Sequence, residues 1–449
     1  MPVKLVNIDR DTPLLLPPDL RDWIQEDDMV HFVIDAVQGL VLEHLHYNES
    51  GSGSPQYPPR MMLSLLLYCY SQAIFSSRKI ETATYRNVSV RFLTADTHPD
   101  HDTIAAFRSD NPELLKECFV KVVLLANKLG MVKMGKVSVD GSKFRANASK
   151  HRNVTAKRAD ELIPEIEADL AELVKQAEAA DQSNEIDGDK LPESIANRQK
   201  LLEKLKVAKA EAERRAKEKH AEKQREYEEK CRKREAKQKG PKPKPPPDEP
   251  EIDEDQQINF TDPDSRVMRN GSNKAFEQNY NPQAVVDNEN GILIGARVSQ
   301  SGNDFGELLA NVESIPEELG LPDQLLADSG YGSGEEVLAL EAQGVDMYVC
   351  MGREAEQLRR AYEFRPDPPK GSPEPKAQWR VEMKAKLATE EGRKIYGERF
   401  HSGEVVFGII KHVLGFRQFS MRGIEKVVSE WDLIGGAYNL KKMFKLQNG

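Results

Sequence analysis

Three carboxylates stand at the ends of strand-like runs or in a helical run, where they could hold metal ions together. Asp140 ends the run 136–140 and Asp328 ends the run 324–328, and a glycine follows each within two residues. Glu404 opens the run 404–411, whose spacing puts it on the same helix face as Lys411. Carboxylate oxygens bind hard divalent cations, and two such ions can stabilise the attacking and leaving oxygens of a phosphodiester. The pattern predicts a two-metal site with Asp140, Asp328 and Glu404 as catalytic residues and metal ligands.

Other polar residues compete for such roles. Asp287 also ends a strand-like run, but the turn residues 288–291 that follow favour a structural role. His98 and His101 lie close together without a further ligand at a useful spacing, so helix capping and surface roles are the better interpretation. Neither group displaces the three carboxylates as the predicted site.

The segments around these carboxylates resemble the DDE transposases of bacterial insertion sequences, in the IS4/IS5-like superfamily. The matching segments are 140–148, 327–332, 404–411 and 415–423. The chain differs in one spacing, because four residues separate Arg399 from Glu404 where the family signature has three. The resemblance implies a ribonuclease-H-like core and an enzyme that binds transposon ends, cuts DNA and joins the freed 3'-OH to a target.

The resemblance also implies the ligands and partners. Tyr396 and Arg399 resemble the family's terminal-base and phosphate contacts, and Lys411 would hold a phosphate as a point charge. Further DNA-binding residues are expected at Arg417, Arg422, Lys143 and Arg86. The expected cofactor is Mg²⁺, two ions per site, with Mn²⁺ as a substitute. The expected partners are the double-stranded DNA of terminal inverted repeats and of the target, bound by a homodimer or larger assembly.

Two other functions remain open from the sequence. A ribonuclease-H-like nuclease without strand transfer would use the same carboxylates and metals. A domesticated DNA-binding or scaffold protein would not need them, so the presence of Asp140, Asp328 and Glu404 argues against it. An assay of strand transfer would separate the first two functions.

Composition points to a cytoplasmic protein rather than a membrane protein, and the resemblance to transposases implies association with the nucleoid. The apolar run 61–67 is too short to span a bilayer, and the first residues lack the apolar region of a signal peptide. Four scattered cysteines without a CxxC pair indicate reduced thiols rather than a zinc cluster. The net charge of −10 does not exclude DNA, because residues 404–449 carry seven Lys or Arg against four acids.

The expected fold class is α/β, with an all-α N-terminal domain over residues 1–130. Apolar periodicity predicts helices over 23–45 and 112–129, and an N-cap for a further helix lies in 99–103. Around Tyr85 and Arg86 the short helices could form a helix-turn-helix surface for DNA, or simply a packing domain. Both interpretations stay open here.

Residues 131–152 and 259–449 should form the catalytic domain, a ribonuclease-H-like mixed sheet flanked by helices. Strands are predicted over 136–140, 283–287, 292–298, 324–328 and 345–350, and helices over 305–312 and 334–343. The 288–291 turn predicts a hairpin between the second and third of these strands. A proline-rich loop over 366–375 precedes the final helices.

Residues 153–258 read as a charged helical insertion. Leucine stripes from Leu162 to Leu173 and from Leu191 to Leu205 flank a polar loop over 181–189, which predicts an antiparallel helical pair. Beyond 210 the apolar stripe ends, so the helix should be solvated up to about 238. The stretch 240–250, rich in Lys and Pro, reads as an extended linker.

Overall fold

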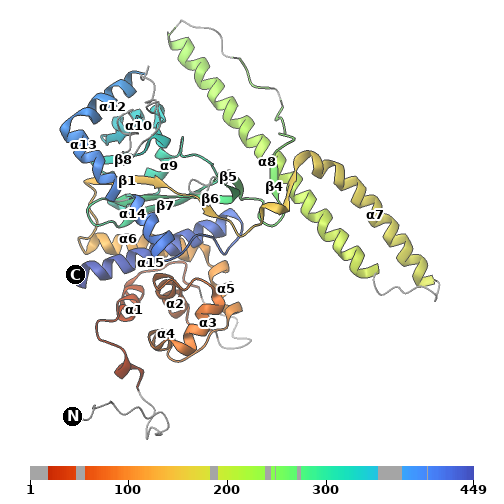
Figure 1. Ribbon diagram of the computed structural model, residues 1–449, viewed down its shortest axis with the longest axis horizontal. Helices are drawn as coiled ribbons and strands as arrows, with labels where there is room; N and C mark the ends of the chain where they lie inside the picture. The colour runs from red at the N-terminus through yellow and green to blue at the C-terminus, as the bar shows by residue number, and fades with distance from the viewer. Residues whose placement is uncertain are drawn as a thin grey trace, which may run out of the picture.

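The computed structural model describes residues 19–46, 56–182, 191–237, 244–247, 249–269, 275–351, 377–401 and 403–448. A mixed sheet and its helices form the body of the molecule, and a long helical arm projects from one end of it (Figure 1). The predicted loop over 366–375 lies outside the described residues, as do most of the predicted loop over 181–189 and part of the linker over 240–250.

The central sheet has the strand order β2-β6-β1-β8-β9, with β5 and β7 also paired to β6. The strands are β1 (Lys136–Gly141), β2 (Phe144–Arg145), β5 (Arg266–Arg269), β6 (Phe276–Asp287), β7 (Leu293–Ser299), β8 (Gln324–Ala327) and β9 (Asp346–Val349). β1 runs antiparallel to β6 and parallel to β8, which is parallel to β9. The predicted hairpin is confirmed as β6 and β7, so the fold is mixed α/β with a mixed sheet.

The predicted strands are buried along their length because helices and loops cover them. Val137 and Val139 of β1 are fully buried, as are Leu325 and Leu326 of β8. The helix predicted from 305 begins later, as α9 (Leu308–Glu313), since Gly306 has a φ of +80° that ends the preceding loop. α10 (Gly334–Ala342) forms where it was predicted.

Helix α15 (Ile424–Asn448) joins the N-terminal helices to the sheet. The fully buried Trp431 stacks on Phe407 with ring centroids 5.8 Å apart, and its Nε1 donates to the carbonyl of Gln283 in β6 at 3.1 Å. On the other side, a Cβ at Gly435 would lie 2.9 Å from the ring of Phe119, so glycine lets α6 (Pro112–Lys128) approach closely. The helical part and the sheet therefore share one hydrophobic core.

Capping residues set the positions at which two of the N-terminal helices begin. They are α1 (Met29–Gly39), α2 (Pro59–Ser71), α3 (Ser77–Arg86), α4 (Val88–Leu93) and α5 (His101–Asp110). The helix expected from 23 starts instead at Met29, because the Asp28 side chain accepts from the Val30 amide at 2.8 Å. Asp100 caps α5 through the Thr103 amide at 2.6 Å, as expected. His98 stacks on Tyr85 with centroids 3.8 Å apart, which is a packing role.

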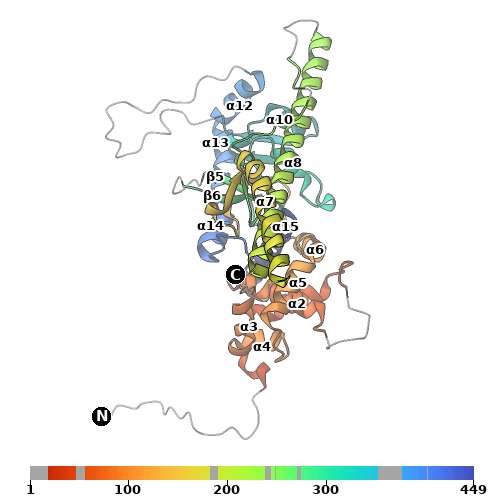
Figure 2. The same cartoon turned by 90° about the vertical axis from the view of Figure 1, so that its right-hand side faces the viewer.

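The insertion forms the arm as two long helices side by side, α7 (Ala156–Gln182) and α8 (Leu191–Lys237) (Figure 2). At its base, β3 (Asn153–Thr155) pairs antiparallel with β4 (Gln257–Asn259). A small separate core, which includes Ile166 and Leu205, holds the helices together. The predicted antiparallel helical pair is confirmed, whereas the proposed domain boundaries stay a prediction.

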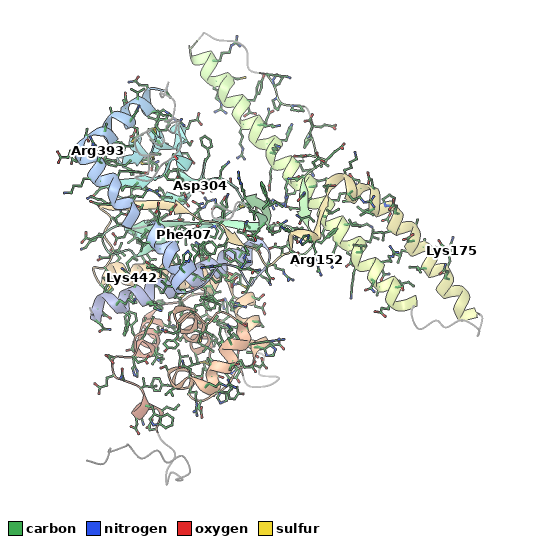
Figure 3. The ribbon with its side chains drawn as sticks, viewed as in Figure 1. Arg152, Lys175, Asp304, Arg393, Phe407 and Lys442 are labelled. Carbon is green, nitrogen blue, oxygen red and sulfur yellow. The ribbon has the colours of Figure 1, made fainter. Side chains whose placement is uncertain are left out.

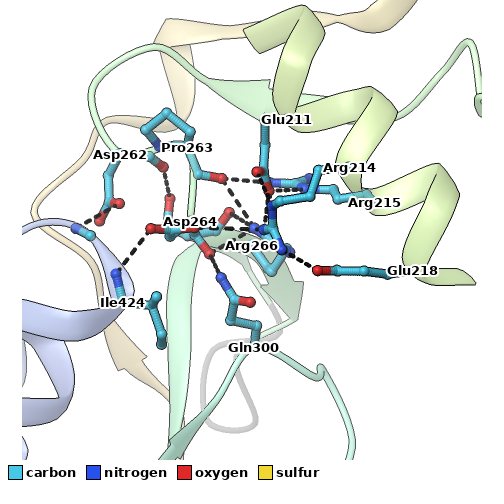
Figure 4. Close-up of polar contacts among 12 residues, drawn as sticks. Glu211, Arg214, Arg215, Glu218, Asp262, Pro263, Asp264, Arg266, Gln300 and Ile424 are labelled. Carbon is cyan, nitrogen blue, oxygen red and sulfur yellow. Dashed lines mark hydrogen bonds and ion pairs between the residues drawn. The ribbon is translucent and has the colours of Figure 1, made fainter. Parts of the chain in front are cut away.

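A buried ionic cluster fastens the arm to the body (Figure 4). Glu211 of α8 accepts from Arg215 Nε at 2.7 Å and from Arg266 Nη2 of β5 at 3.4 Å. Arg215 also donates to the Pro263 carbonyl at 2.5 Å. Burial lowers the pKa of Arg266 to about 10, and the nearby Arg215 adds to this effect, so Glu211 is the carboxylate that balances two crowded cations.

The turn 262–266, which includes Pro263 and Arg266 of this cluster, also contacts the start of α15. Asp264 accepts from the Ile424 amide at 3.0 Å, and Asp262 accepts from the Gly423 amide at 3.1 Å. The turn 262–266 therefore links the arm, the sheet edge and α15. This contact fixes the direction in which the arm leaves the body.

We expect Glu211→Ala to lower the free energy of unfolding by about 3 kcal/mol, because it leaves Arg215 and Arg266 buried without their carboxylate. Glu218→Ala is the matched control, since Glu218 is an exposed partner of Arg214 on the same helix and should cost less than about 0.5 kcal/mol. Urea unfolding measures both values. Equal values for the two variants would contradict a stabilising role of the buried cluster.

Candidate active site

The register of two parallel strands brings Asp140 and Asp328 together. Ser138 of β1 pairs with Leu326 of β8, so two residues further along the same register Asp140 lies across from Asp328. Asp328 follows the last residue of β8 and caps the turn after it by accepting from the Gly330 amide at 2.7 Å. Both carboxylates therefore lie at the carboxyl ends of neighbouring strands, where open α/β sheets place their ligand sites.

A glycine allows the third carboxylate to approach. Gly403 opens α14 (Gly403–Gly408) directly against β1, where an added Cβ would lie 2.8 Å from the Cβ of Asp140. Glu404 follows immediately, and its side chain is about half exposed at 49%. The three predicted catalytic residues thus come from two strand ends and one helix start.

Arg399 lies between two of these carboxylates. It is 6% exposed, in the short helix η6 (Glu398–His401). Its Nη2 donates to Glu404 Oε1 at 3.0 Å, and its Nη1 lies 3.9 Å from Asp140 Oδ1. The extra residue between Arg399 and Glu404 does not prevent this contact. Tyr396 lies beside it, with its ring centroid 5.9 Å from the guanidinium carbon.

Asp140 is the most perturbed of the three carboxylates. Burial raises its pKa to about 7, the charges of Asp328 and Glu404 raise it further, and Arg399 opposes them. A carboxyl with this pKa is close to half protonated at neutral pH. A divalent cation at this position would favour the charged form.

Lys411 connects the helical segment that begins at Gly403 to the loop that follows Asp140. Its ammonium donates to Ser142 Oγ at 2.6 Å and to the Lys143 carbonyl at 2.8 Å, and it lies 4.3 Å from the ring centroid of Phe144. Burial lowers the pKa of Lys411 to about 8. It lies in the π-helical turn Ile409–Val413, and the polar contacts of its ammonium are with 142–143.

A fourth carboxylate, Asp304, was missed from the sequence. Its Oδ1 accepts from Asn281 Nδ2 at 2.8 Å and from Gln283 Nε2 at 2.9 Å. An added Cβ would lie 2.6 Å from that oxygen at Gly141 and 3.4 Å from Oδ2 at Gly330, the glycines that follow Asp140 and Asp328. The polar cluster Ser-Gly-Asn-Asp at 301–304, which directly precedes the predicted helix over 305–312, is the sequence signal for a functional loop at this place.

The remaining predicted DNA-binding residues do not all lie near the three carboxylates. Lys143 donates to the Arg269 carbonyl at 2.9 Å, and Arg417 donates to the Lys411 carbonyl at 2.9 Å. Arg422 donates to the Asn147 carbonyl at 2.9 Å. Arg86 is exposed on α3, among the N-terminal helices and away from the sheet (Figure 1). The structure therefore gathers the three carboxylates with Arg399 and Lys411, and leaves Arg86 apart.

Asp287 has the structural role expected of it. Its Oδ1 accepts from the Glu289 amide at 2.9 Å, and its Oδ2 accepts from the Asn290 amide at 3.2 Å. These bonds close the turn of the β6–β7 hairpin. The carboxylate is thus committed to the turn.

The carboxylate set suits a hard divalent ion. Asp140 and Asp328 offer oxygen ligands, and the mutual repulsion that raises the pKa of Asp140 is the kind that a cation relieves. Within the described residues, no three His, Cys, Asp or Glu side chains are close enough to form a ready-made metal cluster, and Glu404 is turned toward Arg399. Joint metal binding therefore requires the Glu404 carboxylate to exchange this arginine for the ion.

Two family models match separate parts of the chain. Residues 18–110 match the family model of a transposase domain (DUF772), and residues 255–440 match that of a transposase DDE domain. The second match includes Asp328 and Glu404, whereas Asp140 precedes it and is separated from it by the arm. No curated protein and no solved structure matches the chain. Across the described ranges, no helix has both the length and the apolar character of a membrane span. The two family matches support a DDE transposase.

We expect the free energy of unfolding to fall as pH rises from about 4 to 7, because Asp140 has an ordinary pKa of 3.8 when unfolded and about 7 when folded. The folded state then binds the extra proton, so stability is present at low pH and lost through this window. Asp140→Asn should remove about 2–4 kcal/mol of this pH dependence. The buried Asp432, whose pKa burial also raises to about 7, keeps its own share in both proteins.

Chemical unfolding of wild type and Asp140→Asn at several pH values measures the difference. Mn²⁺ should restore stability at pH 7 in the wild type only, because the ion binds the charged carboxylate. Parallel pH profiles for the two proteins would contradict a buried, perturbed Asp140.

Proposed function

We propose that this DDE transposase mobilises a bacterial insertion sequence of the IS4/IS5-like superfamily, by cutting DNA at the transposon ends and joining the freed 3'-OH to a target. The observation that carries the proposal is the convergence of Asp140, Asp328 and Glu404 at one end of the β1–β8 pair. The two transposase family matches on either side of Asp140 support it. The proposal includes a ribonuclease-H-like fold for the core.

In the proposed reaction, Asp140, Asp328 and Glu404 would hold two Mg²⁺ ions, for which Mn²⁺ could substitute. Bound there, the ions would supply Lewis-acid stabilisation of the attacking and leaving oxygens of the phosphodiester. Asp140, whose pKa burial raises to about 7, would hold such a cation in its charged form. Cleavage and strand transfer are then the same displacement with water or a 3'-OH as nucleophile.

Arg399 holds the carboxylates of Glu404 and Asp140 in place. It holds Glu404 at 3.0 Å and lies 3.9 Å from Asp140, which offsets part of their repulsion. With Glu404 engaged as a metal ligand, the Arg399 guanidinium would be available for a DNA phosphate. Tyr396 beside it is suited to a terminal base, and Lys411 sits between the helix and the loop 142–143, close enough to Asp140 for the two charges to interact.

The other parts of the chain take the supporting roles. We assign residues 1–130 to end binding and assembly, with Arg86 on the exposed face of α3 as a DNA contact, and Lys143, Arg417 and Arg422 to contacts nearer the site. The substrate is double-stranded DNA of the terminal inverted repeats and of the target, bound by a homodimer or larger assembly. Such an enzyme works where the chromosome is, in the cytoplasm at the nucleoid.

We expect Asp140→Asn, Asp328→Asn and Glu404→Gln each to reduce cleavage of end DNA in Mg²⁺ by at least about 100-fold, because each removes one metal-binding charge with little change in volume. Asp287→Asn is the control, as it changes a carboxylate at a strand end whose partners are backbone amides, including those of the hairpin turn. Labelled duplexes carrying the ends of the insertion sequence measure the rates.

Wild-type rates in any one of the three variants would remove that residue from the site. Cleavage without joined product, under conditions that support joining by other transposases, would favour a nuclease that lacks strand transfer. DNA binding with no metal-dependent cleavage by the wild type would favour a scaffold protein.

A further inference from the structure

Two stretches that directly follow the proposed catalytic carboxylates contain no acid. Residues 141–155 follow Asp140 and residues 405–424 follow Glu404, and neither stretch contains Asp or Glu although the chain has a net charge of −10. Together they carry seven Lys or Arg and two His, namely Lys143, Arg145, Lys150, His151, Arg152, Lys411, His412, Arg417 and Arg422. This is a local excess of positive charge beside the site.

The two stretches lie side by side in the fold. The Arg145 amide donates to the Arg417 carbonyl at 3.1 Å, and the Phe419 amide donates to the Arg145 carbonyl at 2.9 Å. Asn147 Nδ2 donates to the Ser420 carbonyl at 2.6 Å. Residues 141–155 and 405–424 therefore form one continuous surface, which we call the basic strip.

The basic strip runs from the candidate active site to the base of the arm. It begins beside Asp140 and Glu404 and ends at β3, from which α7 departs. Arg152 lies where the arm meets the body (Figure 3), and its carbonyl accepts from the Phe260 amide at 2.9 Å on the returning chain. The basic strip thus connects the candidate active site to the base of the helical insertion.

A notch at this junction is suited to a phosphate. It has a volume of about 430 Å³ and is lined by Asn147, Ala148, Ser149, Arg152, Thr261, Gln418 and Arg422, with no carboxylate among them. Arg422 is held in place by its bond to the Asn147 carbonyl at 2.9 Å. Two guanidinium groups with neighbouring amides and hydroxyls are the donors that bind phosphate oxygens.

The cations of the strip differ from those of the arm. On the arm, Lys206 pairs with Glu167 at 2.9 Å and Lys209 pairs with Asp160 at 2.7 Å, so their charge is compensated. On the strip, Arg417 and Arg422 are exposed and donate to backbone carbonyls. The charge of the strip is therefore available to an external anion.

The residue types exposed on the basic strip favour binding of duplex DNA over binding of unpaired bases. All four of its Phe residues, Phe144, Phe407, Phe416 and Phe419, are buried in the core, and the strip contains no Tyr or Trp. Binding of single strands relies on exposed aromatic rings on which bases stack. A surface of exposed cations without an exposed Phe, Tyr or Trp ring is suited to contacts with the phosphate backbone.

We propose that the basic strip binds the backbone of duplex DNA that continues from the scissile position to the base of the arm, with Arg152 and Arg422 holding a phosphate in the notch. The proposal rests on the proposed function, since it assigns a path to that enzyme's DNA. The contacts are independent of base sequence. The arm then stands where the duplex leaves the catalytic body.

The test uses the full chain, a mixed-sequence duplex of about 40 base pairs and Ca²⁺ in place of Mg²⁺, with affinity measured by fluorescence anisotropy over a range of salt. Arg152→Gln and Arg422→Gln should each weaken binding several-fold and reduce the slope of log affinity against log salt by about 1, and the double variant by about 2. Lys175→Gln, an exposed cation on the outer part of α7 (Figure 3), is the matched control and should change neither quantity. Circular dichroism melts check that all variants fold.

Three results would overturn the proposal. Salt slopes of the Arg152 and Arg422 variants equal to that of Lys175→Gln would show that the notch holds no phosphate of the duplex. Single-stranded DNA that binds as tightly as the duplex, with the same loss in the variants, would exclude duplex recognition. Competition by millimolar inorganic phosphate would indicate a site for a free anion.

Failure of the proposed function gives a different pattern. If the salt slopes change as expected but no Mg²⁺-dependent cleavage of end DNA occurs, the strip binds DNA and the catalytic assignment is wrong. The two proposals can therefore fail separately.

Discussion

The structure depends most on the cost of burying the Asp140 carboxylate beside two other carboxylates. Asp140 is buried at the end of β1, with Asp328 opposite in register and Glu404 brought near by Gly403. Carboxylates in such a place repel one another, and burial adds to the cost of their charge. Arg399 and the raised pKa of Asp140 reduce that cost. During catalysis, the proposed metal ions would compensate the negative charge in place of Arg399 and of the proton on Asp140.

The surrounding fold keeps this unfavourable cluster in place through packing. Trp431 of α15 lies against Phe407, which follows Glu404 by three residues, and against Phe144, which follows Asp140 by four. Lys411 bonds the loop between Asp140 and Phe144. Both segments that carry the basic strip are therefore fastened to the same buried indole, so the strip and the carboxylates keep a constant relation to one another.

The arm also has a set direction relative to the basic strip and the carboxylates. The turn 262–266 bonds α8 on one side and the start of α15 on the other, so the direction of the arm is set by contacts with the body. Because the strip ends at the same junction, DNA bound along it would meet the arm in a fixed orientation. A rigid junction of this kind suits an enzyme that must hold long DNA while it acts on one phosphodiester.

The sequence by itself determined the local elements and the candidate chemistry. Strand-like runs that end in Asp140 and Asp328, the hairpin at 288–291 and the leucine stripes of the arm all depend on residues near one another, whose periodicity records their burial. Only the tertiary structure decided how distant residues meet. The bonds of Lys411 to the loop 142–143, the place of Asp304 beside both glycines, and the pairing of residues 141–155 with 405–424 join segments up to about 270 residues apart. No local pattern encodes these contacts, because strand register and helix packing fix them only when the whole core has formed.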